Sequence, residues 1–360
     1  MKKADITLLV VTIILTLFGL LMIYDVSAFV AFRDFADKYH YIKDQATWVA
    51  LGFIALLFFS FFDYHKLYYL SLPLLLAALV LLVLVFVPGI GVWALGAQRW
   101  INTGLFILQP AEFVKLALAI YLSAWFSTKE KGKFLAFALL LGLVIALIML
   151  QPDMGTASIV LSEAVILYFL SGGRLLNFFL MAPVVLSLGY LLIKLEPYRA
   201  ARLTSSLSFN EPIQNTSYHV KQILIALGMG GLTGVGLGNS LQKYAYLPEN
   251  TTDSIFAIIA EELGFLGATI LIGLYIIVVW RGFLIATRTK DAFGKLLAAG
   301  IISFLAIQTI INLGSQTALL PLTGIPLPLI SYGGSSLIID LCAIGILLNI
   351  SKQSHVPYGA

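Results

Sequence analysis

Ten long apolar runs, separated by shorter polar connections, constrain the fold of this chain more than any other feature of its sequence. Most approach the roughly 20 residues that a helix needs to cross the hydrocarbon core of a bilayer. Hydrophobic residues make up 60% of the chain and charged residues only 11%, far below the roughly one quarter found in soluble domains. We therefore predict a single all-α integral membrane domain, residues 1–360, with about ten transmembrane helices. The runs fall at about 5–30, 45–62, 67–87, 110–126, 134–150, 156–171, 178–195, 254–280, 296–318 and 333–350.

The distribution of Lys and Arg predicts the orientation of these helices. An even number of spans places both termini on one side, and cytoplasmic connections carry the excess of basic residues. One set of connections holds Lys2, Lys3, Lys66, Lys129, Lys131, Lys133, Arg174, Arg281, Arg288, Lys290, Lys295 and Lys352. The short connections on the other side hold only Arg33, Lys38, Lys43 and Arg99. Both termini are therefore predicted to be cytoplasmic, and 196–253 forms a large extracytoplasmic loop between helices seven and eight.

Several classes of function find no support in the sequence. The net charge of +4 is modest and speaks to membrane orientation, so no nucleic-acid partner is expected. The single cysteine, Cys342, offers no disulfide framework, and the four histidines are scattered, without the spacing of a zinc or haem site. The glycine-rich segment 230–239 follows no predicted strand. It therefore indicates close backbone approach or a re-entrant segment rather than a dinucleotide site.

One carboxylate lies at the outer end of the eighth predicted helix. Asp253 ends the polar segment 246–253 and directly precedes an apolar run. An ionisable group in such a place is costly, and a functional role is the default hypothesis. The alternative is that Thr252 or Asp253 simply caps the helix. Because Glu261 and Glu262 follow two turns later, three acids crowd the outer half of one helix, and from the residues alone a catalytic or ligand role for Asp253 is as well supported as capping.

Two cations on the same outer side are candidates for binding an anionic group. Arg99 precedes the fourth span, and Lys115 lies three residues after Glu112 within it, so the last two share one helical face. Glu112 and Lys115 could form an ion pair that stabilises the helix end. We favour the other interpretation, in which Arg99 and Lys115 attract a phosphate-bearing lipid head group, with Glu112 in the same site.

Five further polar residues on the outer side are candidate substrate contacts: Asp153, Lys243, Glu249, Ser331 and Tyr332. For Asp153, N-capping of the sixth span is a sufficient alternative. For Lys243, a surface charge is an equal alternative, and Glu249 is an acid that could share a proton with Asp253. The glycines after Tyr332 indicate close helix packing as well. Deeper in the last span, Asp340 is expected to pair with a neighbouring helix.

These segments together resemble the SEDS family of polytopic membrane proteins, which contains FtsW, RodA and SpoVE. The resemblance covers nearly the whole chain and is closest to the FtsW division branch. It departs from the family at 250–251, where Asn-Thr stands in place of the common Ala-His, and at Ser254, where the family has an aromatic residue. The matching stretches are 96–100, 109–112 with Lys115, 151–157, 246–267 and 328–336.

The resemblance implies a peptidoglycan glycosyltransferase that polymerises lipid II into glycan strands at the outer face of the bacterial cytoplasmic membrane, in cell division or cell-shape maintenance. In such a reaction Asp253 would accept the proton of the attacking sugar hydroxyl. Arg99 and Lys115, or a bound divalent metal cation, would stabilise the leaving pyrophosphate. The implied partners are lipid II, the growing glycan strand and a class B penicillin-binding protein.

Two other functions fit a chain of this kind. A lipid II flippase or other lipid transporter would need a polar path that reaches the cytoplasmic side, where Glu163 is the main intramembrane charge. A non-catalytic scaffold for a transpeptidase would not need the outer acid and the outer cations together. The sequence therefore favours chemistry at the outer face.

Overall fold

The computed structural model describes residues 4–94, 96–104, 106–128, 134–174, 176, 177, 179, 218–244 and 246–353. Its elements, in chain order, are α1 (Ile6–Phe35), α2 (His40–Phe61), α3 (His65–Leu84), β1 (Gly91–Ala94), β2 (Ala97–Asn102), β3 (Ile107–Leu108), α4 (Pro110–Phe126), α5 (Phe134–Leu150), α6 (Met154–Leu170), α9 (Tyr218–Gly230), α10 (Ile255–Arg288), α11 (Ala292–Gln316) and α12 (Gly334–Gln353).

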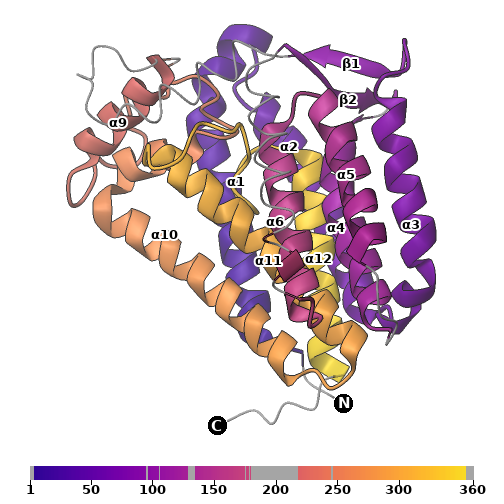
Figure 1. Cartoon of the computed structure of the whole chain (residues 1–360). Coiled ribbons are helices and arrows are strands. Elements are labelled where there is room, and N and C mark those ends of the chain that lie inside the picture. Colours follow the sequence, from indigo (N-terminus) through magenta and orange to yellow (C-terminus); the bar gives the residue numbers. More distant parts are fainter. Residues whose placement is uncertain are drawn as a thin grey trace.

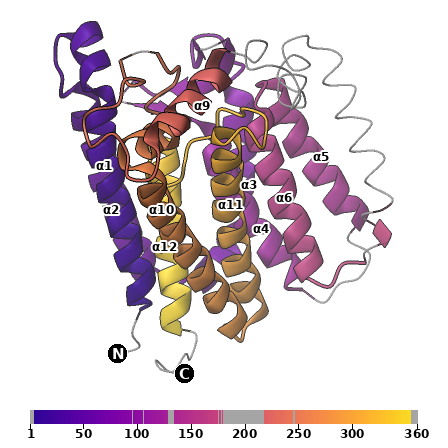
Figure 2. The same ribbon diagram turned by 90° about the vertical axis from the view of Figure 1, so that its left-hand side faces the viewer.

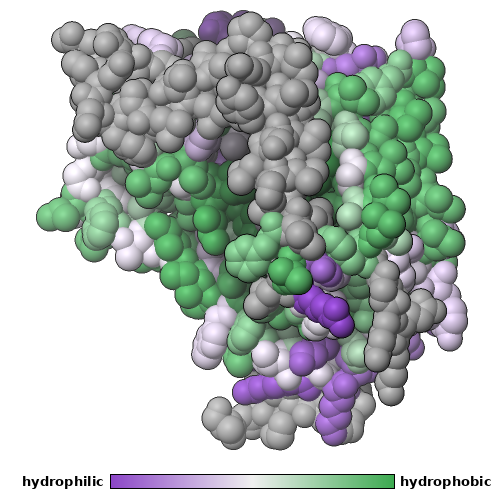
Figure 3. All heavy atoms as spheres, in the orientation of Figure 1, coloured by the Kyte–Doolittle hydropathy of each residue, from purple (hydrophilic) through white to green (hydrophobic). Residues whose placement is uncertain are grey.

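Nine of the ten predicted spans coincide with described helices, which confirms the helical membrane fold. The remaining prediction, 178–195, and the loop segment 196–217 lie outside the described residues, apart from Phe179. Within the described ranges, six helices are long and apolar enough to cross a membrane, and α5 and α6 are shorter apolar helices. Apolar side chains cover the flank of the bundle above a polar lower end (Figure 3).

The helices pack around two apolar cores. One joins α1, α2, α10, α11 and α12, and the other joins α3 to α6. Without a hydrophobic force between lipid-immersed helices, small residues that allow close approach stabilise such contacts. A Cβ on Gly345 of α12 would lie 2.6 Å from the carbonyl oxygen of Leu56, and one on Gly19 would lie 2.7 Å from the Cα of Ile330. These glycines let α12 meet α2, and α1 meet the segment before α12.

Both ends of the described chain lie at one end of the bundle (Figures 1 and 2). The backbone N–H of Asp5 donates to Ser351 Oγ at 3.1 Å, and Arg281 Nη2 lies 2.6 Å from Asp5 Oδ2. The start of α1, the lower end of α10 and the end of α12 are thus fastened together. This agrees with the predicted common side of the two termini, and the opposite end is the outer face.

A small antiparallel sheet at the outer end was not predicted from the sequence, which indicated only a connection over 88–109. The strand order is β1-β2-β3, with Gly91 opposite Ile101, Ala94 opposite Ala97 and Ile101 opposite Leu108. The register shifts between Val92 and Trp93, an irregularity of the kind that bends a short ribbon. The sheet lies at the outer end of the bundle (Figure 1) and holds Arg99 on β2.

Helix α10 is broken at Gly264, whose φ of 66° and ψ of −169° are not helical. The glycine-rich segment after α9 inserts its backbone at the break, as the sequence predicted in expecting close backbone approach. A Cβ on Gly234 would lie 2.0 Å from the carbonyl oxygen of Glu262. Four hydrogen bonds of 2.9–3.1 Å run from the N–H groups of Val235, Gly236, Phe265 and Leu266 to the carbonyls of Glu261, Glu262, Gly231 and Leu232, respectively.

Candidate active site

Asp253 lies at the outer end of α10 and is 7% exposed. It is not the helix cap: the capping position is Ser254, whose side chain makes no capping hydrogen bond. Thr252 Oγ1 lies 3.4 Å from Asp253 Oδ1. The carboxylate is therefore close to the outer surface while its backbone belongs to the fixed turn that starts α10.

The segment 319–332 between α11 and α12 packs on this turn. The Ser331 hydroxyl donates to the carbonyl of Thr252 and accepts the N–H of Leu327 at 2.8 Å. The N–H of Tyr332 donates to the carbonyl of Thr251 at 2.9 Å. Ser331 and Tyr332 thus hold the Asp253 turn. Their main contacts are structural, as the alternative of close packing predicted for this segment.

The hydroxyl of Tyr332 has a partner as well. It donates to Asp44 Oδ2 of α2 at 2.6 Å. Burial, together with this hydrogen bond to a carboxylate, raises the pKa of Tyr332 above its ordinary value. The phenol therefore stays protonated at physiological pH and ties the last outer turn to α2.

Two side chains of α11 anchor both the loop and the catalytic candidate. Asn312 Nδ2 donates to the carbonyl of Asp253 at 2.9 Å and to that of Ile325 at 2.8 Å. One turn below, Gln308 Nε2 donates to the carbonyl of Pro326 at 3.0 Å. The sequence reasoning missed both residues, although polar amides four residues apart in an otherwise apolar helix were a signal that could have revealed them.

The expectation that Lys115 faces outward to meet a phosphate is wrong. Its side chain is 0% exposed, and Nζ lies 2.8 Å from Glu112 Oε2 and donates to Gln308 Oε1 at 2.5 Å. The ion pair that the sequence offered as the alternative is present. Lys115 and Glu112 therefore support the loop through Gln308 instead of lining the outer surface.

Arg99 is placed differently from Lys115, because it remains partly exposed. From β2 its guanidinium donates to the carbonyl of Gln151 at 3.1 Å and to that of Pro152 at 2.5 Å. In the same turn Asp153 accepts the N–H of Thr156 at 3.0 Å and so caps α6, the alternative considered for it from the sequence. Arg99 keeps donors for an outer ligand, whereas Asp153 is 4% exposed and engaged in the cap.

The turn held by Arg99 and the turn that carries Asp253 flank the same loop. A Cβ on Gly155 would lie 3.0 Å from the carbonyl oxygen of Thr323, and a Cβ on Gly324 would lie 4.0 Å from Asp253 Oδ2. Residues 323–325 thus lie between the two turns. A carboxylate and a partly exposed guanidinium therefore stand on opposite flanks of one outer loop.

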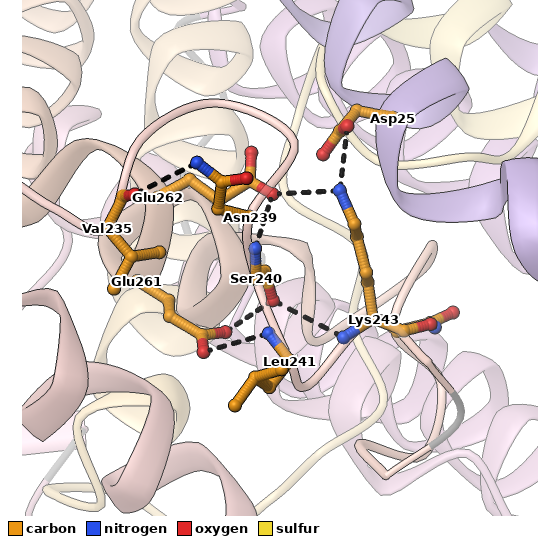
Figure 4. A network of polar contacts seen from close by, with 9 residues as sticks. Asp25, Val235, Asn239, Ser240, Leu241, Lys243, Glu261 and Glu262 are labelled. Carbon is orange, nitrogen blue, oxygen red and sulfur yellow. Dashed lines mark hydrogen bonds and ion pairs between the residues drawn. The ribbon is translucent and has the colours of Figure 1, made fainter.

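Lys243, expected to contact the substrate, is also enclosed, at 5% exposure. Its Nζ lies 2.9 Å from Asp25 Oδ1 of α1 and 3.1 Å from Glu262 Oε1 of α10 (Figure 4). Burial alone would lower the pKa of Lys243, but the hydrogen bonds and charges of the two carboxylates raise it above 10.5. Glu261 accepts the hydroxyl of Ser240 and the N–H of Leu241, the latter at 3.2 Å.

Glu249 is the predicted site residue that stays exposed next to Asp253. Its Oε2 accepts the Thr252 hydroxyl at 3.0 Å, and its carbonyl accepts the N–H of Ser254 at 3.1 Å. A φ of 49° at Glu249 bends the chain toward the turn. Glu249 therefore remains a candidate second acid at the outer end of α10.

A divalent cation would find few protein ligands at this site. Across the described part of the chain, no three His, Cys, Asp or Glu side chains gather as a metal-binding group. Near Asp253 the exposed carboxylate is that of Glu249. A cation would have to take most of its oxygen ligands from a phosphate group and water.

The comparisons with known proteins give the family. The sequence pattern described as cell cycle protein, FtsW/RodA/SpoVE, matches residues 5–356. This chain belongs to the FtsW/RodA/SpoVE family. Stage V sporulation protein E of Bacillus subtilis is 41% identical to it over 98% of both chains. The probable peptidoglycan glycosyltransferase FtsW of Geobacter metallireducens is 38% identical over 98% of this chain and 96% of that protein.

A solved structure extends the likeness to three dimensions. A chain from a study of the structural coordination of polymerization and crosslinking by a peptidoglycan synthase complex matches with a TM-score of 0.79 at 26% identity, over 99% of each chain. This FtsW/RodA/SpoVE protein is accordingly a multi-pass protein of the bacterial cytoplasmic membrane.

In this FtsW/RodA/SpoVE protein, the two residues that depart from the common motif, 250 and 251, lie in the turn before Asp253. Asn250 is 7% exposed and its Nδ2 donates to the carbonyl of Lys243 at 3.2 Å. A histidine reaches the same turn from another element, since His219 Nε2 of α9 lies 2.7 Å from Ser254 Oγ. The Asp253 turn is thus braced by side chains from α9, α11 and the 319–332 loop.

Proposed function

We propose that this protein is a peptidoglycan glycosyltransferase that polymerises lipid II at the outer face of the membrane, with Asp253 as its general base. The observation that carries this proposal is the placement of Asp253. Its carbonyl is held by Asn312 at 2.9 Å and its turn by Ser331, so the carboxylate is fixed at the outer end of the bundle. The relatives named above include one whose name states this activity.

The reaction joins two lipid-linked disaccharides. The 4-hydroxyl of one sugar attacks the anomeric carbon of the other, the new glycosidic bond forms, and the bond to the lipid pyrophosphate breaks. Asp253 accepts the proton that the attacking hydroxyl loses. A fixed carboxylate near a low-dielectric surface suits this task because no reorganisation is needed when the proton moves.

The leaving pyrophosphate carries negative charge into the site, and Arg99 is the cation best placed to meet it. Arg99 is partly exposed, and two of its donors already bind the carbonyls of Gln151 and Pro152, which fixes the guanidinium. Lys115 is enclosed and supports the loop through Gln308. We therefore assign the leaving-group role to Arg99 and a supporting role to Lys115.

A class B penicillin-binding protein is the proposed partner. The matched structure comes from work on a peptidoglycan synthase complex that couples polymerization and crosslinking. Polymerised glycan must be crosslinked at the same face of the membrane, so a transpeptidase bound to this chain would receive its substrate directly.

Transport of lipid II is the alternative that the structure disfavours. Such a protein needs a polar path to the cytoplasmic end, where several contacts tie the described helix ends together. Tyr64 donates to Asp291 Oδ1 at 2.6 Å, and Asn349 Nδ2 donates to the carbonyl of Ser60 at 3.0 Å. Arg281 pairs with Asp5 at 2.6 Å.

The test is polymerisation of lipid II by the purified protein, with and without a cognate class B penicillin-binding protein. We expect Asp253→Asn to lower the polymerisation rate about 10²- to 10⁴-fold, because the neutral amide cannot accept the proton. Binding of lipid II should persist, since the backbone contacts of the turn remain.

The matched control is Asp34→Asn, which removes an exposed outer carboxylate paired with Arg33 at 2.6 Å. It should polymerise at the wild-type rate. Polymer formed at that rate by Asp253→Asn would disprove the catalytic assignment. A wild-type protein that binds its partner and lipid II but forms no polymer would instead support the scaffold function.

A further inference from the structure

Helix α11 carries a buried row of side-chain amides on one face. Gln308, Asn312 and Gln316 are each four residues apart, which places them one above another toward the outer end. All three side chains are 0% exposed. Such a row in an apolar helix is costly unless every amide has a hydrogen-bonding role.

The lower two amides show how the following loop runs. Gln308 binds the carbonyl of Pro326 at 3.0 Å, and Asn312 binds that of Ile325 at 2.8 Å. Residue numbers in the loop decrease as those in α11 increase, so the loop runs antiparallel to the helix. The loop lies at the outer end of α11 (Figure 2). Continued by one turn, this register brings Thr323 and Gly324 to the level of Gln316.

The same level holds the catalytic carboxylate. A Cβ on Gly324 would lie 4.0 Å from Asp253 Oδ2. The hydroxyl of Thr323 is buried and has no hydrogen-bond partner among the described residues, and the same is true of Asn312 Oδ1. The loop and the helix that adjoin Asp253 thus each carry an unpartnered polar atom, on Thr323 and on Asn312.

Gln316 is the strongest member of this group. Neither Nε2 nor Oε1 has a hydrogen-bond partner in the described part of the protein. A buried primary amide offers two donors and two acceptor positions, and leaving all of them unmade is destabilising. An apolar residue of the same size would serve packing better, so the amide at 316 points to a ligand.

We propose that Gln316, with Thr323, forms a neutral subsite that hydrogen-bonds the acceptor sugar beside Asp253. This inference rests on the proposed glycosyltransferase function and adds a positioning residue to it. The amide donates and accepts at once, which suits the hydroxyl and amide groups of an N-acetylated sugar. A phosphate would instead be met by a cation such as Arg99.

The experiment compares wild type with Gln316→Met and Gln316→Leu, which keep the volume and remove the amide. Both variants should melt at or above the wild-type temperature in detergent, because an unpaired buried amide is lost. In the polymerisation assay the KM for lipid II should rise about tenfold, the loss expected for an uncompensated hydrogen bond. The upward shift in melting temperature caused by added lipid II should shrink in both variants.

Thr317→Val provides the matched control. Thr317 is exposed and its hydroxyl donates to the carbonyl of Leu313 at 3.0 Å within the helix. Its KM for lipid II should equal that of wild type.

Two results would overturn the subsite. One is a wild-type KM and an unchanged lipid II thermal shift in Gln316→Met and Gln316→Leu. The other is a lower melting temperature of both variants, which would show that the amide is already paired in the free protein. Either result, obtained with an active wild type, leaves the proposed function intact, whereas an inactive wild type counts against that function alone.

Discussion

Lys243 illustrates how much of the site depends on single residues placed by tertiary structure. Its ammonium group joins α1, through Asp25, to α10, through Glu262, across the glycine-rich segment (Figure 4). A lysine and a carboxylate that are both enclosed stabilise one another only as a pair, because each alone would be a buried charge. The residue therefore holds the outer loop in position.

Replacing this lysine should be costly. We expect Lys243→Met to lower the free energy of unfolding by about 3–5 kcal/mol, since it leaves Asp25 and Glu262 unpaired. Thermal unfolding in detergent measures the change. Lys43→Met removes an exposed pair with Asp37, whose lysine side chain is 67% exposed, and should cost less than about 1 kcal/mol. Equal effects of the two substitutions would contradict the role given to Lys243.

The pair also predicts a pH dependence at the alkaline end. Because the pKa of Lys243 is raised in the folded protein, its stabilising contribution is complete below the ordinary lysine pKa of 10.5. It is lost as the pH rises through the higher pKa of the folded state. The melting temperature of wild type should therefore approach that of Lys243→Met only above about pH 10.5, and convergence at neutral pH would refute the linkage.

At the scale of single residues, the sequence indicated which residues are candidates but did not reveal which contacts they make. Asp253 stood out as a candidate because a carboxylate at the end of a membrane helix is costly. Lys243 was misjudged because its partners are 218 and 19 residues away. Asn312 was missed because its partners are two backbone carbonyls, although its spacing from Gln308 on one helix was a usable signal.

Among the elements, α10 has the feature that most affects the site. Its outer piece starts just after Asp253 and carries Glu261 and Glu262, whereas the longer lower piece runs down from Gly264 (Figure 1). The carbonyls freed at the break accept N–H groups of the inserted glycine-rich segment. Backbone pairing of this kind satisfies the polar groups that a broken membrane helix would otherwise leave open.

Adding a single methyl group should test the break. A Cβ on Gly264 would lie 2.2 Å from the N of Gly234, and its φ of 66° disfavours any other residue. We expect Gly264→Ala to destabilise the protein by at least about 3 kcal/mol. Gly273→Ala in the same helix meets nothing within 4 Å and should stabilise by roughly 0.5–1 kcal/mol. Comparable melting temperatures of the two variants would exclude a strict glycine requirement at 264.

The helices themselves were predictable from hydropathy, because each span must bury its backbone bonds internally. The break at Gly264 was not, since the apolar run continues through it. The sheet over β1 to β3 was hidden for another reason: its strands are 2–6 residues long and irregular in register.

The described part of the molecule differs between its two ends. Near the outer end, described side chains such as Gln316 and Thr323 have unpartnered polar atoms. At the cytoplasmic end the contacts of Asp5, Tyr64 and Asn349 join α1, α10, α11, α12 and the turn between α2 and α3. An outer site above a closed base suits an enzyme that takes substrate from one leaflet.

This asymmetry predicts that the protein does not carry lipid II across the bilayer. In proteoliposomes, fluorescent lipid II should cross at the same rate as in protein-free vesicles, while polymer accumulates on the side where the outer face is accessible. Chemical quenching of the fluorophore from one side measures the crossing. Faster crossing with wild type and Asp253→Asn alike would restore the transport function.

The seal at the cytoplasmic end has a consequence for how the protein is made. The N–H of Tyr64 and the carbonyl of Ser60, on either side of the turn between α2 and α3, both bind Asn349 of α12. Tyr64 and Asn349 are 285 residues apart. During translation this early turn stays at the cytoplasmic face with these polar groups open to the cytosol, and its two hydrogen bonds with Asn349 can form only after α12 has been synthesised.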